Sequence, residues 1–193
     1  MKEFDKIHFV TSNRNKYEEA SEIFGRYKLR LEWVNISVEE VQSDLLLDVI
    51  LWKGYDILKI LGNVPFIVED TGLFINYLNG FPGTYSSYVY KSIGCKGILK
   101  LLEGVEDRTA YFLSYGLLHM KNNIFKLFKV RIDGIISFEE RGMGGFGFDP
   151  IFIPEGHKIT YAEMGPSVKN NFSHRGKLFN MIAKYILSRR LVM

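Results

Sequence analysis

The chain has 193 residues, of which 47 % are hydrophobic and 24 % charged, and 25 Lys and Arg against 22 Asp and Glu give a formal net charge of +3. This balance is typical of a soluble globular protein and excludes a polybasic or disordered chain. The single cysteine, Cys95, excludes an intrachain disulfide, and no apolar run approaches the roughly 18 to 20 residues of a membrane span. With no secretory pattern at the N-terminus, we expect a cytoplasmic protein with no membrane partner.

The first seventy residues alternate between strand and helix patterns. We predict strands at 7–10, 31–36 and 64–68, with helices at 13–26 and 45–61 between them. In the first helix the apolar residues Tyr17, Ala20 and Phe24 recur at spacings of three and four, the period of a helix face. Such β-α-β-α-β order favours a sheet with helices packed on it.

The remaining chain adds further strands and a final helix. Residues 109–119 and 124–132 predict two strands joined by a hairpin turn at 120–123, and residues 151–153 a short strand. Residues 173–190 predict a helix with Ser173 as its N-cap. With no linker or repeat, we expect one α/β domain over residues 1–193, built on a long mixed sheet.

A polar cluster lies between the first strand and the first helix. Thr11 and Asn13 supply short polar side chains there, and Lys16 follows one turn into the helix. Helix N-termini present free backbone N–H groups and a positive dipole, which suit a phosphate. The alternative is an ordinary N-cap followed by a solvated lysine.

Two adjacent carboxylates, Glu69 and Asp70, come at the end of the third predicted strand. Adjacent carboxylates repel each other and favour a bound cation, and hard oxygen ligands suit Mg²⁺. Glu40, after the second strand, is a further candidate ligand. The alternative is a polar turn with solvated charges.

A glycine-rich segment at 142–150 contains the spacing GxGxxG, but a strand follows it where a dinucleotide fingerprint needs a helix. Its phenylalanines Phe146 and Phe148 suit stacking on a flat base. The alternative is a bulged turn with both rings in the core.

A basic cluster opens the last predicted helix, where Lys169, His174 and Arg175 oppose the positive end of the helix dipole. A bound anion or a carbonyl-rich ligand would explain them, and a solvated basic turn is the alternative.

Other features favour structural roles. Basic residues alternate with Phe125 and Phe128 at 121–131, which favours a hairpin with one buried face over a nucleic-acid platform. We therefore expect no nucleic-acid partner. We expect Cys95 to be a buried, inert thiol.

Taken together and in this order, the clusters resemble the inosine triphosphate pyrophosphatase family, also called Ham1-like. The matching segments are TSNRNKYEE at 11–19, VEDTGLFINYLNGFPGTYSS at 68–87, GGFGFDPIFIPEG at 144–156 and TYAEMGPSVKNNFSHR at 160–175. The resemblance implies a homodimer with two lobes around a central nucleotide-binding cleft. It also implies Mg²⁺-dependent hydrolysis of inosine, deoxyinosine and xanthosine triphosphates to monophosphate and pyrophosphate, which removes deaminated purines from the nucleotide pool.

The resemblance also implies roles for individual residues. Asp70 is implied as the base for the attacking water, with Glu69 as its catalytic neighbour, and Glu40 and Asp70 as Mg²⁺ ligands. The implied substrate-binding residues are Thr11, Asn13, Lys16 and Lys53 for the phosphates, Thr71 beside them, Phe146 stacked on the purine, and Phe148, Asp149, Lys169, Ser173, His174 and Arg175 around the base and sugar.

The basic cluster that opens the last predicted helix suggests how a deaminated purine could be preferred over adenine. A donor such as Lys169, His174 or Arg175 would bond the 6-oxygen of a purine and would be left unpaired against the 6-amino group of adenine. This reasoning does not explain rejection of GTP. The alternative enzyme is a pyrophosphatase of similar fold that acts on other modified nucleotides, such as pyrimidines. The alternative from another class is a nucleotide- or nucleic-acid-binding protein without turnover.

Overall fold

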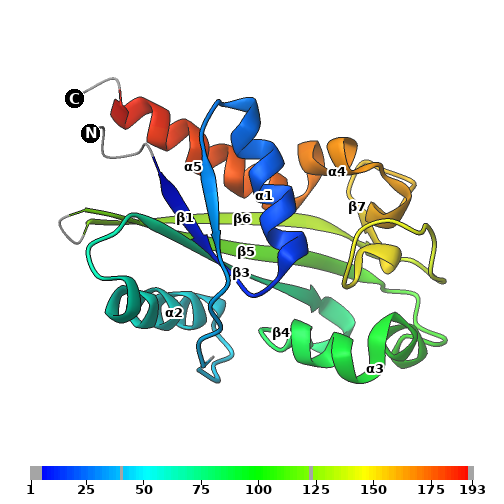
Figure 1. Ribbon diagram of the computed structural model, residues 1–193. Coiled ribbons are helices and arrows are strands. Elements are labelled where there is room, and N and C mark those ends of the chain that lie inside the picture. Colours follow the sequence, from blue (N-terminus) through cyan, green and yellow to red (C-terminus); the bar gives the residue numbers. More distant parts are fainter. Residues whose placement is uncertain (1–5, 40, 122–123, 191–193) are drawn as a thin grey trace. The chain divides into compact units, whose positions relative to one another are not determined.

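A computed structural model describes residues 6–39, 41–121 and 124–190 (Figure 1). Within these residues the sheet has seven strands in the order β2-β1-β3-β5-β6-β7, with β4 paired to β3. The strands are β1 (Ile7–Val10), β2 (Leu31–Val34), β3 (Phe66–Ile75), β4 (Pro82–Gly83), β5 (Thr109–Met120), β6 (Ile124–Ile136) and β7 (Phe152–Pro154). The α-helices are α1 (Arg14–Arg26), α2 (Leu46–Leu61), α3 (Ser86–Leu101), α4 (Pro166–Phe172) and α5 (His174–Arg190).

The chain divides into two compact units. Unit 1 comprises Met1–Asp70, Ser114–Val130 and Arg175–Met193, and unit 2 comprises Thr71–Leu113 and Arg131–His174. Strands β3, β5 and β6 each contribute residues to both units.

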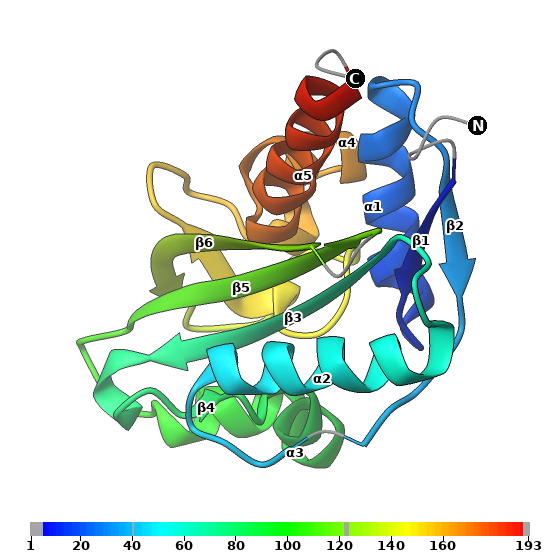
Figure 2. The ribbon, with the colours of Figure 1, turned by 90° about the vertical axis from the view of Figure 1, so that its left-hand side faces the viewer.

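In unit 1 the first three strands of the sheet run parallel to one another, and helices cover them. Strand β1 pairs in parallel with β2 and with β3, and His8 lies opposite Phe66. Helices α1 and α5 cover one face of these strands and α2 the other (Figure 2). The edge of Phe179 packs on Phe9 and Phe24 with ring centroids 5.0 and 5.9 Å apart, so the first and last helices share one core with β1. This burial is the main source of stability for the unit.

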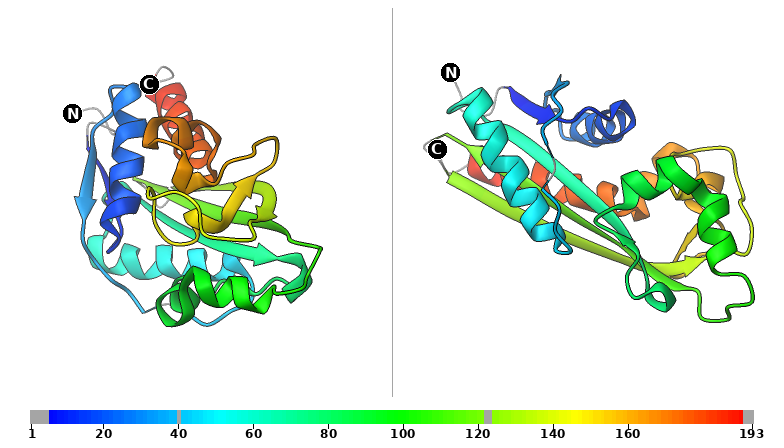
Figure 3. Two further views of the ribbon diagram at one scale, coloured as in Figure 1. Left: turned by 90° about the vertical axis from the view of Figure 1, so that its right-hand side faces the viewer. Right: turned by 90° about the horizontal axis from the view of Figure 1, so that it is seen from below.

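Unit 2 continues the sheet with antiparallel pairs. Strand β4 pairs with β3, and β7 with β6. Helices α3 and α4 lie on opposite sides of its strands (Figure 3). Its core includes Phe112, which contacts Phe152 and the fully buried Tyr161. Two 3₁₀ turns, at Asp149–Ile151 and Tyr161–Glu163, flank β7 in sequence, and the first begins at the end of the glycine-rich segment.

The predicted mixed α/β class is confirmed, and so are the predicted strands near 7–10, 109–119 and 151–153. The prediction for the third strand was wrong at its end, because β3 continues through Glu69 and Asp70 to Ile75. A strand can carry two carboxylates in its middle when cations offset their charge, as they do here. The second strand ends at Val34, short of the predicted Ile36.

Two helices have no counterpart in the predicted elements. Helix α3 contains Gly94 at φ 62°, outside the helical region, and this break removes a continuous apolar period. Helix α4 is a single short segment that begins at Pro166. A period of 3.6 residues cannot be recognised over so few turns. None of the helices described in residues 6–39, 41–121 and 124–190 is both long and apolar enough to cross a membrane.

Candidate active site

The loop between β1 and α1 forms a defined N-terminal cap. The Asn13 side chain accepts a hydrogen bond from the backbone N–H of Lys16 at 3.2 Å, and Thr11 Oγ1 accepts one from the Asn13 N–H at 3.1 Å. The backbone carbonyl of Thr11 accepts a bond from the indole N–H of Trp33 at 2.8 Å. These bonds fix the first turn of α1 and so fix the base of the Lys16 side chain.

The Lys16 ammonium lies beside both predicted carboxylates. Its Nζ is 2.9 Å from Glu69 Oε2 and 3.6 Å from Asp70 Oδ1. From α2, Lys53 Nζ is 4.0 Å from the same Asp70 oxygen. The structure therefore brings four of the predicted site residues together in unit 1, with one carboxylate between two lysines.

Glu69 and Asp70 have different surroundings. The Glu69 side chain is fully buried, and its Oε1 accepts hydrogen bonds from Arg175 Nε at 3.2 Å and from the Ser114 hydroxyl at 3.1 Å. Arg175 also donates to Glu19 at 2.6 Å. The Asp70 side chain keeps 12 % of its surface exposed. Glu69 thus bonds to neighbouring side chains inside the unit, and Asp70 is the carboxylate that a bound molecule can reach.

Unit 2 holds a second buried cluster. Lys169 Nζ donates to Asp149 Oδ2 at 2.6 Å, and both side chains are 4 % exposed. The same Asp149 oxygen accepts the backbone N–H of Phe146 at 2.7 Å. Lys169 Nζ lies 5.0 Å from the centre of the half-buried Phe146 ring. Gly145 has φ 71°, and a Cβ there would overlap the Asp149 carboxylate, so only glycine fits beside it.

The remaining predicted residues of unit 2 are mostly packed inside it. The buried Phe148 ring meets Tyr90 edge-on at 5.4 Å, and the buried His174 ring stacks on Phe112 at 4.4 Å. Ser173 is buried at the junction of α4 and α5. Thr71 follows Asp70 in β3 and is half-buried. The structure therefore places Phe146, rather than Phe148, where its ring is accessible.

The predicted metal ligand Glu40 lies outside the described residues. In the part of the chain that is described, no group of three or more His, Cys, Asp and Glu side chains could hold a metal ion. The donor set still fits Mg²⁺, because this ion commonly binds one or two carboxylates and completes its shell with water and substrate phosphates. Asp70, with its exposed surface, matches that requirement.

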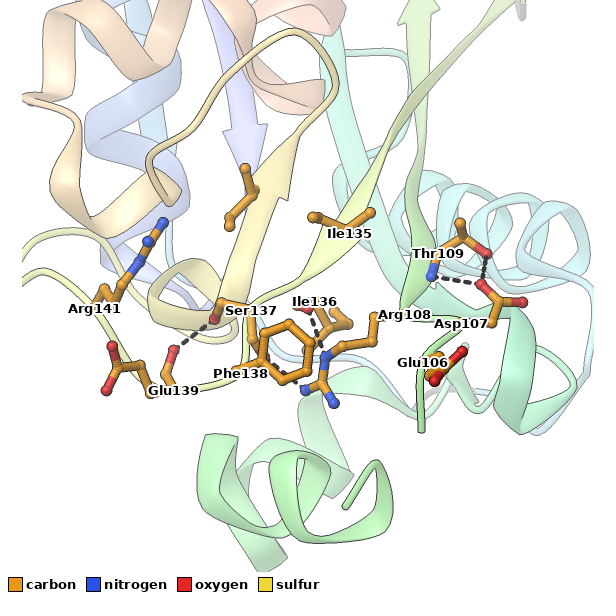
Figure 4. A pocket seen from close by; sticks show the side chains of 11 residues that line it. Glu106, Asp107, Arg108, Thr109, Ile135, Ile136, Ser137, Phe138, Glu139 and Arg141 are labelled. Atoms are coloured by element: carbon orange, nitrogen blue, oxygen red, sulfur yellow. Dashed lines mark hydrogen bonds between the residues drawn. The ribbon is translucent and has the colours of Figure 1, made fainter. Parts of the chain in front are cut away.

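A pocket of about 320 Å³ opens elsewhere in unit 2 (Figure 4). Its wall includes Arg108, whose guanidinium donates to the backbone carbonyls of Leu102, Ile136 and Ser137 at 2.6 to 2.9 Å. Burial lowers the pKa of Arg108 from its ordinary value. None of the predicted site residues lines this pocket, and Arg108 already holds three backbone carbonyls in place.

The structure confirms that Cys95 and Phe128 are buried, as predicted. Cys95 is buried, and burial together with the negative charges of Glu140 and Asp149 raises the pKa of its thiol to about 12. Phe128 on β6 is buried, as a hairpin with one core face requires.

Two residues of the unit 1 cluster were missed from the sequence. Glu19 follows Lys16 by three positions, which places both on one face of α1, and this spacing could have identified it. Ser114 is a lone hydroxyl within an apolar strand, and nothing local distinguishes it from other strand serines.

The chain is similar to known proteins over nearly its whole length. The chain is 45 % identical to a dITP/XTP pyrophosphatase of Pyrococcus horikoshii, covering 94 % of this chain and 96 % of that protein. It is 46 % identical to a dITP/XTP pyrophosphatase of Methanopyrus kandleri, covering 93 % and 95 %. A solved HAM1 protein structure from Coxiella burnetii superposes with a TM-score of 0.80 at 28 % identity, covering 95 % of this chain and 98 % of that one. Since the Ham1 family model also matches residues 7–185, the chain belongs to the Ham1 family.

Proposed function

We propose that this protein hydrolyses non-standard purine nucleoside triphosphates, namely ITP, dITP and XTP, to the nucleoside monophosphate and pyrophosphate. The observation that carries the proposal is the position of Asp70, whose Oδ1 lies 3.6 Å from Lys16 Nζ and 4.0 Å from Lys53 Nζ. A carboxylate beside two cations suits a reaction in which a base orients water next to a polyanionic substrate. Relatives named dITP/XTP pyrophosphatase support the substrate class.

In this proposal unit 1 binds the triphosphate. The first turn of α1 supplies backbone N–H groups and the positive end of the helix dipole, and Lys16 and Lys53 supply ammonium groups. Asp70 accepts a proton from the attacking water as it adds to the α-phosphorus, and pyrophosphate leaves as one unit. Thr11 and Asn13 hold the turn in place through the cap described above.

The residues proposed for the base lie in unit 2. Phe146 offers an aromatic face for stacking, and the Lys169 ammonium supplies a donor for the 6-oxygen of a deaminated purine. Against the 6-amino group of adenine that donor would lose a partner, which disfavours ATP.

The charges of the unit 1 cluster support a divalent cation. Lys16, Lys53 and Arg175 balance Glu19, Glu69 and Asp70, so the cluster has no net charge to offset a triphosphate. We propose Mg²⁺ as the cofactor, held by Asp70 and by Glu40. When bound, the ion would offset phosphate charge and polarise the phosphorus centre.

We also propose that the protein is a cytoplasmic homodimer and that residues 1–193 act as a single domain around a nucleotide-binding cleft. Light scattering would test whether the protein is a dimer, since a dimer has twice the 22.3 kDa of the chain.

The test is a product analysis with Mg²⁺ and, separately, inosine, xanthosine, adenosine and guanosine triphosphates. Monophosphate and pyrophosphate from the first two substrates support the proposal. Diphosphate and orthophosphate would overturn attack at the α-phosphorus, and turnover of modified pyrimidines alone would favour the alternative substrate class.

A variant tests the proposed base in the same assay. Asp70→Asn keeps the shape of the side chain and should lower kcat by at least about 100-fold, the usual scale for loss of a general base. Asp133→Asn, on an exposed ion pair with Arg131, is the matched control and should leave kcat unchanged. Near-normal turnover in Asp70→Asn would remove Asp70 from this role.

A further inference from the structure

The hydroxyl of Ser114 lies inside the unit 1 cluster. Ser114 is fully buried on β5, and its Oγ is 3.1 Å from Glu69 Oε1 and 3.4 Å from the backbone carbonyl of Asp70. A hydroxyl has one proton to donate, and the carboxylate oxygen is the closer and more strongly charged acceptor.

The two oxygens of Glu69 face different partners. Oε1 meets Ser114 and Arg175, and Oε2 meets Lys16 at 2.9 Å. Of these donors, Ser114 has the shortest side chain and stands directly on a strand, whereas the arginine and lysine reach the carboxylate through several rotatable bonds. Of these three donors, Ser114 therefore restricts the orientation of the Glu69 carboxylate most strongly.

We propose that Ser114 is a positioning residue of the reaction: it holds the Glu69 carboxylate so that Lys16 pairs mainly with Glu69 and leaves Asp70 available to water. This inference rests on the proposed function, in which Asp70 is the base. The distances favour it, because Lys16 Nζ is 2.9 Å from Glu69 and 3.6 Å from Asp70. If Glu69 turned away, the ammonium would move toward Asp70 and occupy the oxygen that orients the water.

The kinetic consequence is specific to the catalytic step. Ser114→Ala should lower kcat by about 10- to 100-fold, the range found when partners that orient a functional side chain are removed. KM for dITP should change less than kcat, because, of the proposed substrate contacts, only that of Lys16 involves a group that moves. Ser114→Thr keeps the hydroxyl and should recover most of kcat.

A matched control is available in unit 2. Ser86 is also a buried serine with two hydrogen bonds, accepting from the Leu73 N–H at 2.8 Å and donating to the Gly83 carbonyl at 2.7 Å. Ser86→Ala should lower the melting temperature and leave kcat unchanged. A fall in kcat of equal size in both variants would show that Ser114 is merely structural.

A double-mutant cycle tests whether Ser114 acts through Glu69. In a Glu69→Gln background, adding Ser114→Ala should change kcat by far less than it does in the wild type, because the group it positions is gone. Equal effects in the two backgrounds, or an unchanged kcat in the single Ser114→Ala variant, would overturn the proposal.

A second readout needs no turnover. The ¹³C resonance of the Glu69 carboxyl should shift in Ser114→Ala and stay in place in Ser86→Ala. A wild-type protein that hydrolyses neither dITP nor XTP refutes the proposed function, whereas an unmoved Glu69 resonance in Ser114→Ala refutes the contact on which this inference depends.

Discussion

Replacing Asp149 by alanine tests how strongly the unit 2 cluster depends on one buried ion pair. Lys169 Nζ and Asp149 Oδ2 are 2.6 Å apart, and each side chain is 4 % exposed. Removing one partner of a buried pair costs about 3–5 kcal/mol of unfolding free energy, because the remaining charge loses its main compensation. For a chain of this length, each kcal/mol lowers the melting temperature by about 2–4 °C, so we expect a fall of about 6–20 °C.

The pair of Arg131 and Asp133 provides a matched control. Its N–O distance is also 2.6 Å, but its side chains are 50 % and 51 % exposed. Exposed pairs contribute about 0–1 kcal/mol, so Asp133→Ala should be nearly neutral. The two pairs share the same N–O distance and differ strongly in burial.

Chemical denaturation of four variants completes the test. Asp149→Asn keeps an acceptor for the Phe146 N–H but removes the negative charge. Its loss of stability should therefore come only from the buried Lys169 ammonium, which no longer has a charged partner. The double variant Asp149→Leu/Lys169→Met removes both charges and should be more stable than Asp149→Ala. A loss below about 1 kcal/mol in Asp149→Ala, no more than an exposed pair gives, would refute the reasoning.

Three further predictions concern other parts of the chain. Phe146→Ala should raise KM for dITP by the equivalent of about 1–3 kcal/mol if the ring stacks on the base, with the melting temperature nearly unchanged; an unaltered KM would assign the ring to packing. The Cys95 thiol has a pKa of about 12 in the folded chain and an ordinary value near 9.0, so the folded state holds a proton that the unfolded state releases between these values. Unfolding free energy should therefore fall with rising pH in this window by up to about 1.4 kcal/mol per unit more in the wild type than in Cys95→Ala, and parallel curves from pH-dependent denaturation would contradict this. Arg108→Lys should destabilise the chain by about 2–4 kcal/mol, because one ammonium cannot replace three directed bonds to backbone carbonyls; a melting curve like that of the wild type would count against that role.

The sequence alone predicted the class of fold and most of unit 1, because those features depend on local periodicity. Short strand-like runs located β1, β5 and β7, and the spacing of Tyr17, Ala20 and Phe24 located α1. The glycine break in α3 and the shortness of α4 removed that periodic signal, so both helices required the tertiary structure.

The motifs also predicted candidate site residues, since Lys16, Glu69, Asp70 and Lys169 are polar residues next to apolar segments. Their partners could not be predicted in the same way. Arg175 and Glu69 are 106 positions apart, and Lys169 and Asp149 are 20 apart. Such contacts depend on how distant segments pack together, and local periodicity carries no information about that packing.

The different environments of the two adjacent carboxylates could not be predicted from the sequence either. Sequence presents Glu69 and Asp70 as an equivalent pair, because neighbouring residues share composition and charge. In the folded chain Glu69 is fully buried and contacts Arg175 and Ser114, whereas Asp70 retains exposed surface between Lys16 and Lys53. The residue types that make a hydrolytic site possible are thus determined by the sequence, and which carboxylate is left accessible is decided by tertiary packing.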